Sequence, residues 1–145
     1  PQANPQGGQY QVPPPGYGYS MPADGNTSGM GDTYTTPEVA RGWNWGGFVP
    51  FGLFAFINGS PLWGAIGLLA YFFGLYLIYS IVIGFIGKEQ AWKNRRFDSI
   101  QQYIETMQVW SNWGLALFLI GIVVMVLYIV FVFMVMGMAF MTEYP

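Results

Sequence analysis

The sequence contains no cysteine and no histidine among its 145 residues, and only 8% of its residues are charged. Without cysteine and histidine the chain cannot form disulfides, thiolate metal sites, iron–sulfur clusters or histidine-ligated haem. Catalytic arrangements that pair histidine with a serine or cysteine nucleophile are excluded as well. A soluble domain carries roughly 25% charged residues, so the low charge indicates that much of this chain is not built for contact with water.

Charged residues are missing altogether from two long stretches, 42–87 and 106–142. An α-helix needs about 20 mostly apolar residues to cross a bilayer, and each stretch contains a longer apolar segment. Backbone polar groups have no water to bond in hydrocarbon, so these segments are predicted to be helical. The sequence therefore predicts an all-α integral membrane protein with two long transmembrane helices, in the regions 61–87 and 113–145.

A shorter apolar run lies in the region 42–60 and opens with Trp43 and Trp45 on either side of Asn44. At about 15 residues this run is marginal for a crossing. Pro50 is expected to kink it, because proline removes a helix hydrogen bond. The run is predicted to be either a third span or a re-entrant segment, and the side on which the N-terminus lies depends on which of the two forms.

Residues 1–41 form a tail rich in proline, glycine and tyrosine. Such a composition buries too little apolar surface to offset the entropy lost on ordering. Order in this tail is therefore expected to come from a neighbouring protein, and tyrosine supplies contact area at low entropic cost. The predicted tail contacts are Tyr10, Tyr17, Tyr19 and Tyr34.

The region 88–112 holds four of the five basic residues of the chain. Because lysine and arginine accumulate in cytoplasmic loops, this region is predicted to be cytoplasmic and the C-terminus to lie outside. Ser99 and Gln102 fit a capping box, and apolar residues recur after them at helical spacing. This pattern predicts an amphipathic helix that lies along the membrane surface or against a partner.

Residue type also predicts which side chains lie at the membrane interface and which lie at helix contacts. Tryptophan prefers the headgroup level, and basic side chains near it meet lipid phosphates. Small residues on one face of a helix allow another helix to approach closely, which predicts helix packing at Gly67, Ala70 and Gly74. The predicted membrane-interface and topology residues are Trp43, Trp45, Lys88, Trp92, Lys93, Arg95, Arg96, Trp110 and Trp113.

Two runs carry a recognisable pattern, Gly42-Trp43-Asn44-Trp45-Gly46-Gly47-Phe48 and Gly87-Lys88-Glu89-Gln90-Ala91-Trp92-Lys93-Asn94-Arg95-Arg96-Phe97-Asp98-Ser99, followed by Gln108 and Trp110. With them the chain resembles a bacterial family of small membrane proteins of unknown function. Members show a Trp-Asn-Trp entry to a short hydrophobic segment and an Ala-Trp-x-Asn signature followed by two basic residues. The resemblance covers about residues 42–113. It implies helical spans in a bacterial inner membrane, and it supplies no activity, because none is established for the family.

The function predicted from these features is that of a non-catalytic accessory or structural subunit of a larger bacterial membrane protein assembly, held by helix packing and an ordered tail. The alternative is a membrane-anchored adaptor whose tail recruits soluble partners. Transport and catalysis are disfavoured, because the predicted spans lack the charged residues that mark ion or proton paths. The methionines near the C-terminus are interpreted as apolar packing residues.

Neither a cofactor nor a metal is predicted for this chain, and whether a pigment or quinone lies near it is left open. The expected partners are other membrane protein subunits and lipid. No nucleic acid and no small-molecule substrate is expected.

Overall fold

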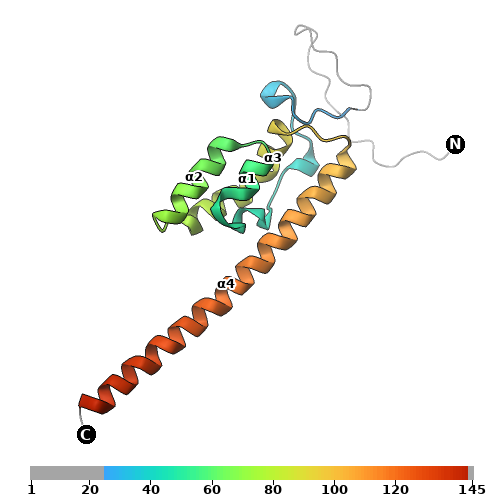
Figure 1. The fold of residues 1–145 in the computed structure, drawn as a ribbon. Helices are drawn as coiled ribbons and strands as arrows, with labels where there is room; N and C mark the ends of the chain where they lie inside the picture. The colour runs from blue at the N-terminus through green and yellow to red at the C-terminus, as the bar shows by residue number, and fades with distance from the viewer. Residues whose placement is uncertain (1–24, 144–145) are drawn as a thin grey trace, which may run out of the picture.

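The computed structural model describes residues 25–143, with side chains described up to residue 141. All regular structure in that range is helical, which confirms the predicted all-α class there. Three helices and several 3₁₀ turns form a compact unit, and one long helix runs along this unit and continues beyond it (Figure 1). The α-helices are α1 (Leu53–Ile57), α2 (Pro61–Phe72), α3 (Tyr76–Asn94) and α4 (Ile100–Glu143), and the 3₁₀ turns are η1 (Gly31–Thr33), η2 (Glu38–Ala40), η3 (Trp45–Phe48) and η4 (Pro50–Gly52).

The long helix α4 contains 44 residues without interruption. It begins at the predicted cap, because the hydroxyl oxygen of Ser99 accepts a hydrogen bond from the Gln102 backbone N–H at 3.1 Å. The predicted separation between an amphipathic helix in 88–112 and a second helix from 113 onward is absent. Nothing at Ser111 and Asn112 interrupts the backbone hydrogen bonding, since neither residue is a proline. Within residues 25–143, α4 is the one helix that is long and apolar enough to cross a membrane.

The region 61–87 forms two helices, so the prediction of one continuous helix there is wrong. α2 ends because Gly74 adopts a left-handed backbone with φ of 72°, which glycine reaches without steric cost. The Gly74 N–H donates to the Tyr71 carbonyl oxygen at 3.4 Å, and the Leu75 N–H donates to the Ala70 carbonyl oxygen at 2.8 Å. These two bonds define a Schellman helix end. α3 then packs back along α2, and the pair forms the α2–α3 hairpin in place of a second long span.

The region 42–60 contains no continuous helix either. Its apolar run is divided among η3, η4 and α1, with Pro50 at the start of η4. Phe51 and Gly52 both have left-handed backbone, with φ of 61° and 69°. A Cβ atom on Gly52 would lie 2.4 Å from the Gly64 carbonyl oxygen, so the close approach to α2 requires glycine. Instead of a third span or a simple re-entrant segment, this region is a folded segment that packs on α2, α3 and α4.

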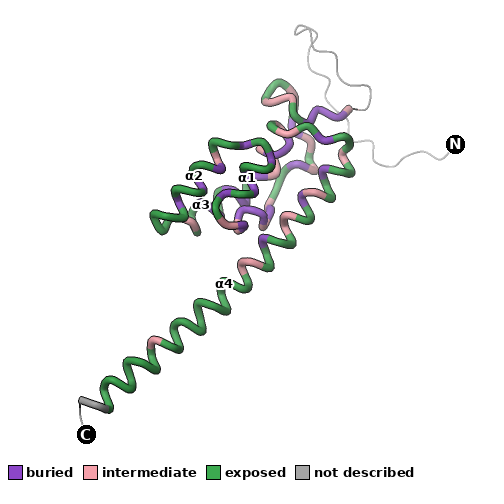
Figure 2. Tube along the Cα trace, in the orientation of Figure 1, coloured by how far each residue is buried: buried purple, intermediate pink, exposed green. Residues whose placement is uncertain are grey.

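One part of the core of the compact unit lies where the end of α3 meets the beginning of α4. Tyr103 of α4 is fully buried, and the rings of Trp92 and Phe97 stand edge-on to it at 5.0 and 5.1 Å. The Tyr103 hydroxyl donates to the Lys88 carbonyl oxygen at 3.0 Å. Burial is concentrated in the compact unit and the adjoining part of α4, whereas the rest of α4 is almost entirely exposed (Figure 2).

Candidate functional site

Residues 88–96 at the end of α3 carry four basic side chains, and we call them the basic signature. They are contacted by residues 26–29, which we call the N-terminal clasp. The Gly29 N–H donates to the Trp92 carbonyl oxygen at 2.7 Å. The Asn26 side-chain amide donates to the Phe97 carbonyl oxygen at 2.7 Å. A Cβ atom on Gly29, where φ is 75°, would lie 2.9 Å from the Arg96 backbone nitrogen, so glycine is required here too. The clasp therefore brings together segments about 70 positions apart.

Both arginines of the signature bond to the chain itself. The Arg96 guanidinium donates to the carbonyl oxygens of Asn26 and Ser28, at 2.7 and 3.0 Å. The Arg95 guanidinium donates to the Asn58 side-chain oxygen at 3.1 Å and lies 5.0 Å from the centre of the Phe97 ring. These contacts position the clasp and the turn before α2. Contact of the two arginines with lipid phosphates stays a prediction.

Lys93 forms two ion pairs, with the Asp32 carboxylate at 2.6 Å and the Glu89 carboxylate at 2.7 Å. The hydrogen bonds to Asp32 and then Glu89 raise the pKa of Lys93, and the hydrogen bond from Lys93 lowers the pKa of Glu89. Lys88 is half-buried, and no ion pair involves it in the part of the chain that the structure describes. Arg95 and Arg96 donate to neutral oxygen atoms, so among the four basic residues of this region Lys93 is the one whose charge is paired with carboxylates in the described part of the chain.

Replacing Lys93 by methionine is expected to lower the free energy of unfolding by about 0.5–1 kcal/mol, because both ion pairs are partly solvated. Glu89, whose pKa is lowered from 4.5, contributes stability above that pH and loses it as the pH falls. Lys93, whose pKa is raised from 10.5, contributes stability below that pH and loses it as the pH rises. The difference in the free energy of unfolding between Lys93→Met and the unmodified protein should stay constant from about pH 5 to 10 and shrink towards pH 3. Thermal unfolding in a nonionic detergent measures this difference.

Lys88→Met is the matched control, because it removes a positive charge that has no such ion pair. Its effect on unfolding is expected to vary little between about pH 3 and 10. If the destabilisation disappeared at acid pH in both variants alike, the pH dependence could not be assigned to the Lys93 ion pairs.

The predicted interface tryptophans lie in different environments. Trp92 is only 2% exposed, and its indole N–H donates to the Thr27 hydroxyl at 3.4 Å, so it is a core residue. Trp113, at 60% exposed, remains open to a surrounding medium. Trp43, Trp45 and Trp110 are half-buried.

Two of those half-buried rings contact neighbouring aromatic rings in edge-on or tilted arrangements. Trp43 lies 5.0 Å from Phe85 of α3, and Trp45 lies 5.4 Å from Phe118 of α4. These contacts join η3 and the residue pair before it to α3 and α4.

Asn44 lies outside the predicted set, yet it is fully buried and joins three elements. Its side-chain amide donates to the Met107 carbonyl oxygen at 3.1 Å, and its side-chain oxygen accepts from the Gly46 N–H at 2.6 Å. Its backbone N–H donates to the Gly84 carbonyl oxygen at 2.8 Å. An isolated polar residue between two tryptophans in an apolar run was the sequence signal for this role.

The small residues Gly67 and Ala70 are buried within the chain. A Cβ atom on Gly67 would lie 2.4 Å from the Tyr79 ring, so Gly67 allows α2 and α3 to approach closely. Gly74 lies in the turn, with nothing within 4 Å of a Cβ built on it. Of the predicted tail contacts, Tyr34 is half-buried, while Tyr10, Tyr17 and Tyr19 lie outside the described residues.

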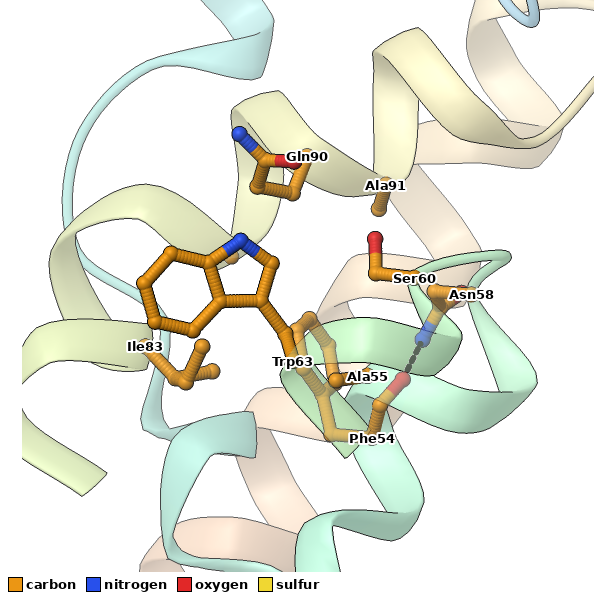
Figure 3. Close-up of a pocket in the computed structure, with 9 residues that line it drawn as sticks. Phe54, Ala55, Asn58, Ser60, Trp63, Ile83, Gln90 and Ala91 are labelled. Atoms are coloured by element: carbon orange, nitrogen blue, oxygen red, sulfur yellow. Dashed lines mark hydrogen bonds between the residues drawn. The ribbon is translucent and has the colours of Figure 1, made fainter. Parts of the chain in front are cut away.

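Several cavities and clefts lie in the described part of the chain. One, about 10 Å³ in volume, lies among Phe54, Asn58 and Trp63 (Figure 3), where the Asn58 side-chain amide donates to the Phe54 carbonyl oxygen at 2.8 Å. This space suffices for about one water molecule. A larger cleft of about 240 Å³ is lined by Lys88 and Gln108, among others. Residues 25–143 contain no group of three or more histidine, cysteine, aspartate or glutamate side chains that could hold a metal ion.

The largest uncovered feature is apolar. Phe72 and Phe73, at the tip of the α2–α3 hairpin, are 74% and 75% exposed. In α4, no residue of the most apolar stretch is buried within the chain. Monomeric soluble proteins rarely expose apolar patches larger than a few hundred Å², so the hairpin tip and the second half of α4 form the candidate interaction surface.

Comparison of the chain with protein-family models, with curated proteins and with solved structures gave no significant match. The resemblance to the bacterial family with the Trp-Asn-Trp pattern therefore stays a prediction.

Proposed function

We propose that the chain is a non-catalytic accessory or structural subunit of a larger bacterial membrane protein assembly. In this proposal α4 crosses the inner membrane, the end of the molecule that carries the clasp is cytoplasmic, and the C-terminus lies outside. The excess of lysine and arginine around residues 88–96 supports that orientation. The observation that carries the proposal is the apolar surface of the hairpin tip and α4, which no part of residues 25–143 covers.

The hairpin tip supplies a second argument for a protein neighbour. α3 begins there without a side-chain cap, and the first N–H groups of any helix lack partners within that helix. Inside a bilayer such groups need a protein neighbour or water, because hydrocarbon offers no hydrogen bonds. Aromatic side chains beside them, Phe72 and Phe73, supply contact area of the kind that dominates protein interfaces.

Site-specific photo-crosslinking in membranes of the native host tests this proposal. Photoreactive residues at positions 72 and 129, in the hairpin tip and the exposed half of α4, are expected to capture the same membrane protein as discrete products. A photoreactive residue at position 101, on the polar face of α4, is the matched control and should not give that product. If neither apolar position captures a protein and the chain runs as a free monomer in mild detergent, the subunit role is overturned.

The adaptor role remains the second candidate, because the clasp fixes the base of the tail to the charged end of α3. Deleting residues 1–24 removes the first part of the tail and keeps residues 26–29 of the clasp in the chain. An adaptor should lose its soluble partners on this deletion. A subunit held by its helices should keep its crosslinks from positions 72 and 129.

A further inference from the structure

We propose that the α2–α3 hairpin is a re-entrant element, which enters one leaflet of the bilayer and returns to the side from which it came. This inference rests on the membrane location given above and does not depend on any partner subunit. It makes α4 the single crossing within the described residues. The committed occupant around the outward side chains of the hairpin is the acyl-chain layer of one leaflet, and the N–H groups at the start of α3 bond water where no protein neighbour is present.

The length of the hairpin fits half a membrane. α2 has 12 residues, and the uncharged part of α3, from Tyr76 to Gly87, is equally long. At 1.5 Å per residue each arm measures about 18 Å, against about 30 Å for the hydrocarbon core. The apolar part of α4 from Trp113 to Met141 measures about 43 Å, which matches a bilayer together with its headgroup layers.

The surface of the hairpin fits lipid. Its two arms hold no charged residue before Lys88, and their inner faces are filled by small residues and the Tyr79 ring. Two polar groups of α3 are bonded within the chain, since the Ser80 hydroxyl donates to the Tyr76 carbonyl oxygen at 2.8 Å and the Tyr76 hydroxyl donates to the carbonyl oxygens of Gly47 and Val49. The Tyr79 hydroxyl, buried between the arms, has no hydrogen-bond partner among the described residues. The side chains that point outward are large and apolar, namely Leu62, Leu69, Phe72, Phe73, Leu77 and Ile78.

The open end of the hairpin is tied to the charged end of the molecule. The Asn94 side-chain amide donates to the Ser60 hydroxyl at 3.0 Å, which joins the last residue of α3 to the residue before α2. The Arg95 bond to Asn58 adds a second link at the same level. In Figure 1 the hairpin extends toward the same side as the exposed half of α4, and it stops well short of the C-terminal end of that helix. Both arms therefore leave from, and return to, the side that carries the basic signature.

The absence of cysteine makes the test direct, because every introduced thiol is the only one in the chain. Three single variants, Phe73→Cys at the tip, Gln101→Cys at the charged end and Met141→Cys near the C-terminus, are reconstituted as purified protein in liposomes. A membrane-impermeant maleimide is added from either side. Labelling after solubilisation in SDS shows that each thiol is present and reactive.

The re-entrant arrangement predicts that Gln101→Cys and Met141→Cys are labelled from opposite sides. Phe73→Cys should react from neither side, at least about tenfold more slowly than the other two, because an apolar surrounding suppresses the thiolate. A fluorophore on Phe73→Cys should be quenched by lipids that carry a quencher near the bilayer centre. Labelling of Phe73→Cys from the side of Met141→Cys would establish a full crossing, and labelling from the side of Gln101→Cys would place the hairpin in water; either result overturns the inference.

Failure of the subunit role would leave these labelling results unchanged, because the liposomes contain no other protein. Conversely, a full crossing of the hairpin would leave the crosslinks from positions 72 and 129 possible. The two experiments therefore separate the two proposals.

Discussion

Replacing Gly114 by alanine is expected to separate α4 from the compact unit and to lower the free energy of unfolding by about 3 kcal/mol. A Cβ atom on Gly114 would lie 1.8 Å from the Trp45 carbonyl oxygen and 2.3 Å from the carbonyl carbon. Both are backbone atoms of η3, so no side-chain rotation can make room. Unfolding by SDS in a nonionic detergent, followed by tryptophan fluorescence, measures the loss.

Gly121→Ala is the matched control in the same helix, seven positions further on. Nothing lies within 4 Å of a Cβ atom built there, and alanine is favoured over glycine in a helix by up to about 1 kcal/mol. This variant should be as stable as the unmodified protein or slightly more stable. If the two alanine variants unfold at the same SDS concentration, the close packing of α4 on η3 is refuted.

The sequence predicts the helical class and the start of α4 because both depend on local chemistry. A charge-free apolar run has to be helical where water is absent, and Ser99 caps a helix through a bond three residues long. The break at Gly74 depends on more than local chemistry. Glycine is frequent in membrane helices, so the residue type alone does not distinguish a helix interior from a turn. What decides is the pairing of Gly67 with Tyr79 across the hairpin, and a hydropathy window contains no such information.

The basic signature shows the same limit from the other direction. Its position at the charged end of the molecule follows from residue type, since lysine and arginine avoid hydrocarbon. The bonding partners of the arginines do not follow from residue type, because Arg96 donates to the carbonyl oxygens of residues about 70 positions earlier. Backbone carbonyl groups look alike in every sequence. Only the fold reveals that a cluster interpreted as a lipid-facing loop holds the N-terminal clasp in place.

Trp92 gives the second large effect, because its two possible roles predict opposite outcomes. As a core residue, 2% exposed and packed edge-on against Tyr103 at 5.0 Å, it should lower the free energy of unfolding by about 3–5 kcal/mol when replaced by alanine. As a headgroup anchor it would leave stability nearly unchanged and alter the depth of insertion. SDS unfolding in detergent distinguishes the two roles.

Trp113→Ala removes the same side chain from a site that is 60% exposed, and it is expected to change the free energy of unfolding by no more than about 0.5 kcal/mol. Both variants replace tryptophan by alanine, so they differ only in whether the site is buried or exposed. Trp92→Ala should also loosen the clasp, since the Trp92 indole bonds to Thr27 and its carbonyl oxygen to Gly29. Faster proteolysis within residues 25–41 in Trp92→Ala, and not in Trp113→Ala, would register that release. Equal stability of the two variants would instead return Trp92 to the membrane interface, where the sequence pattern alone had placed it.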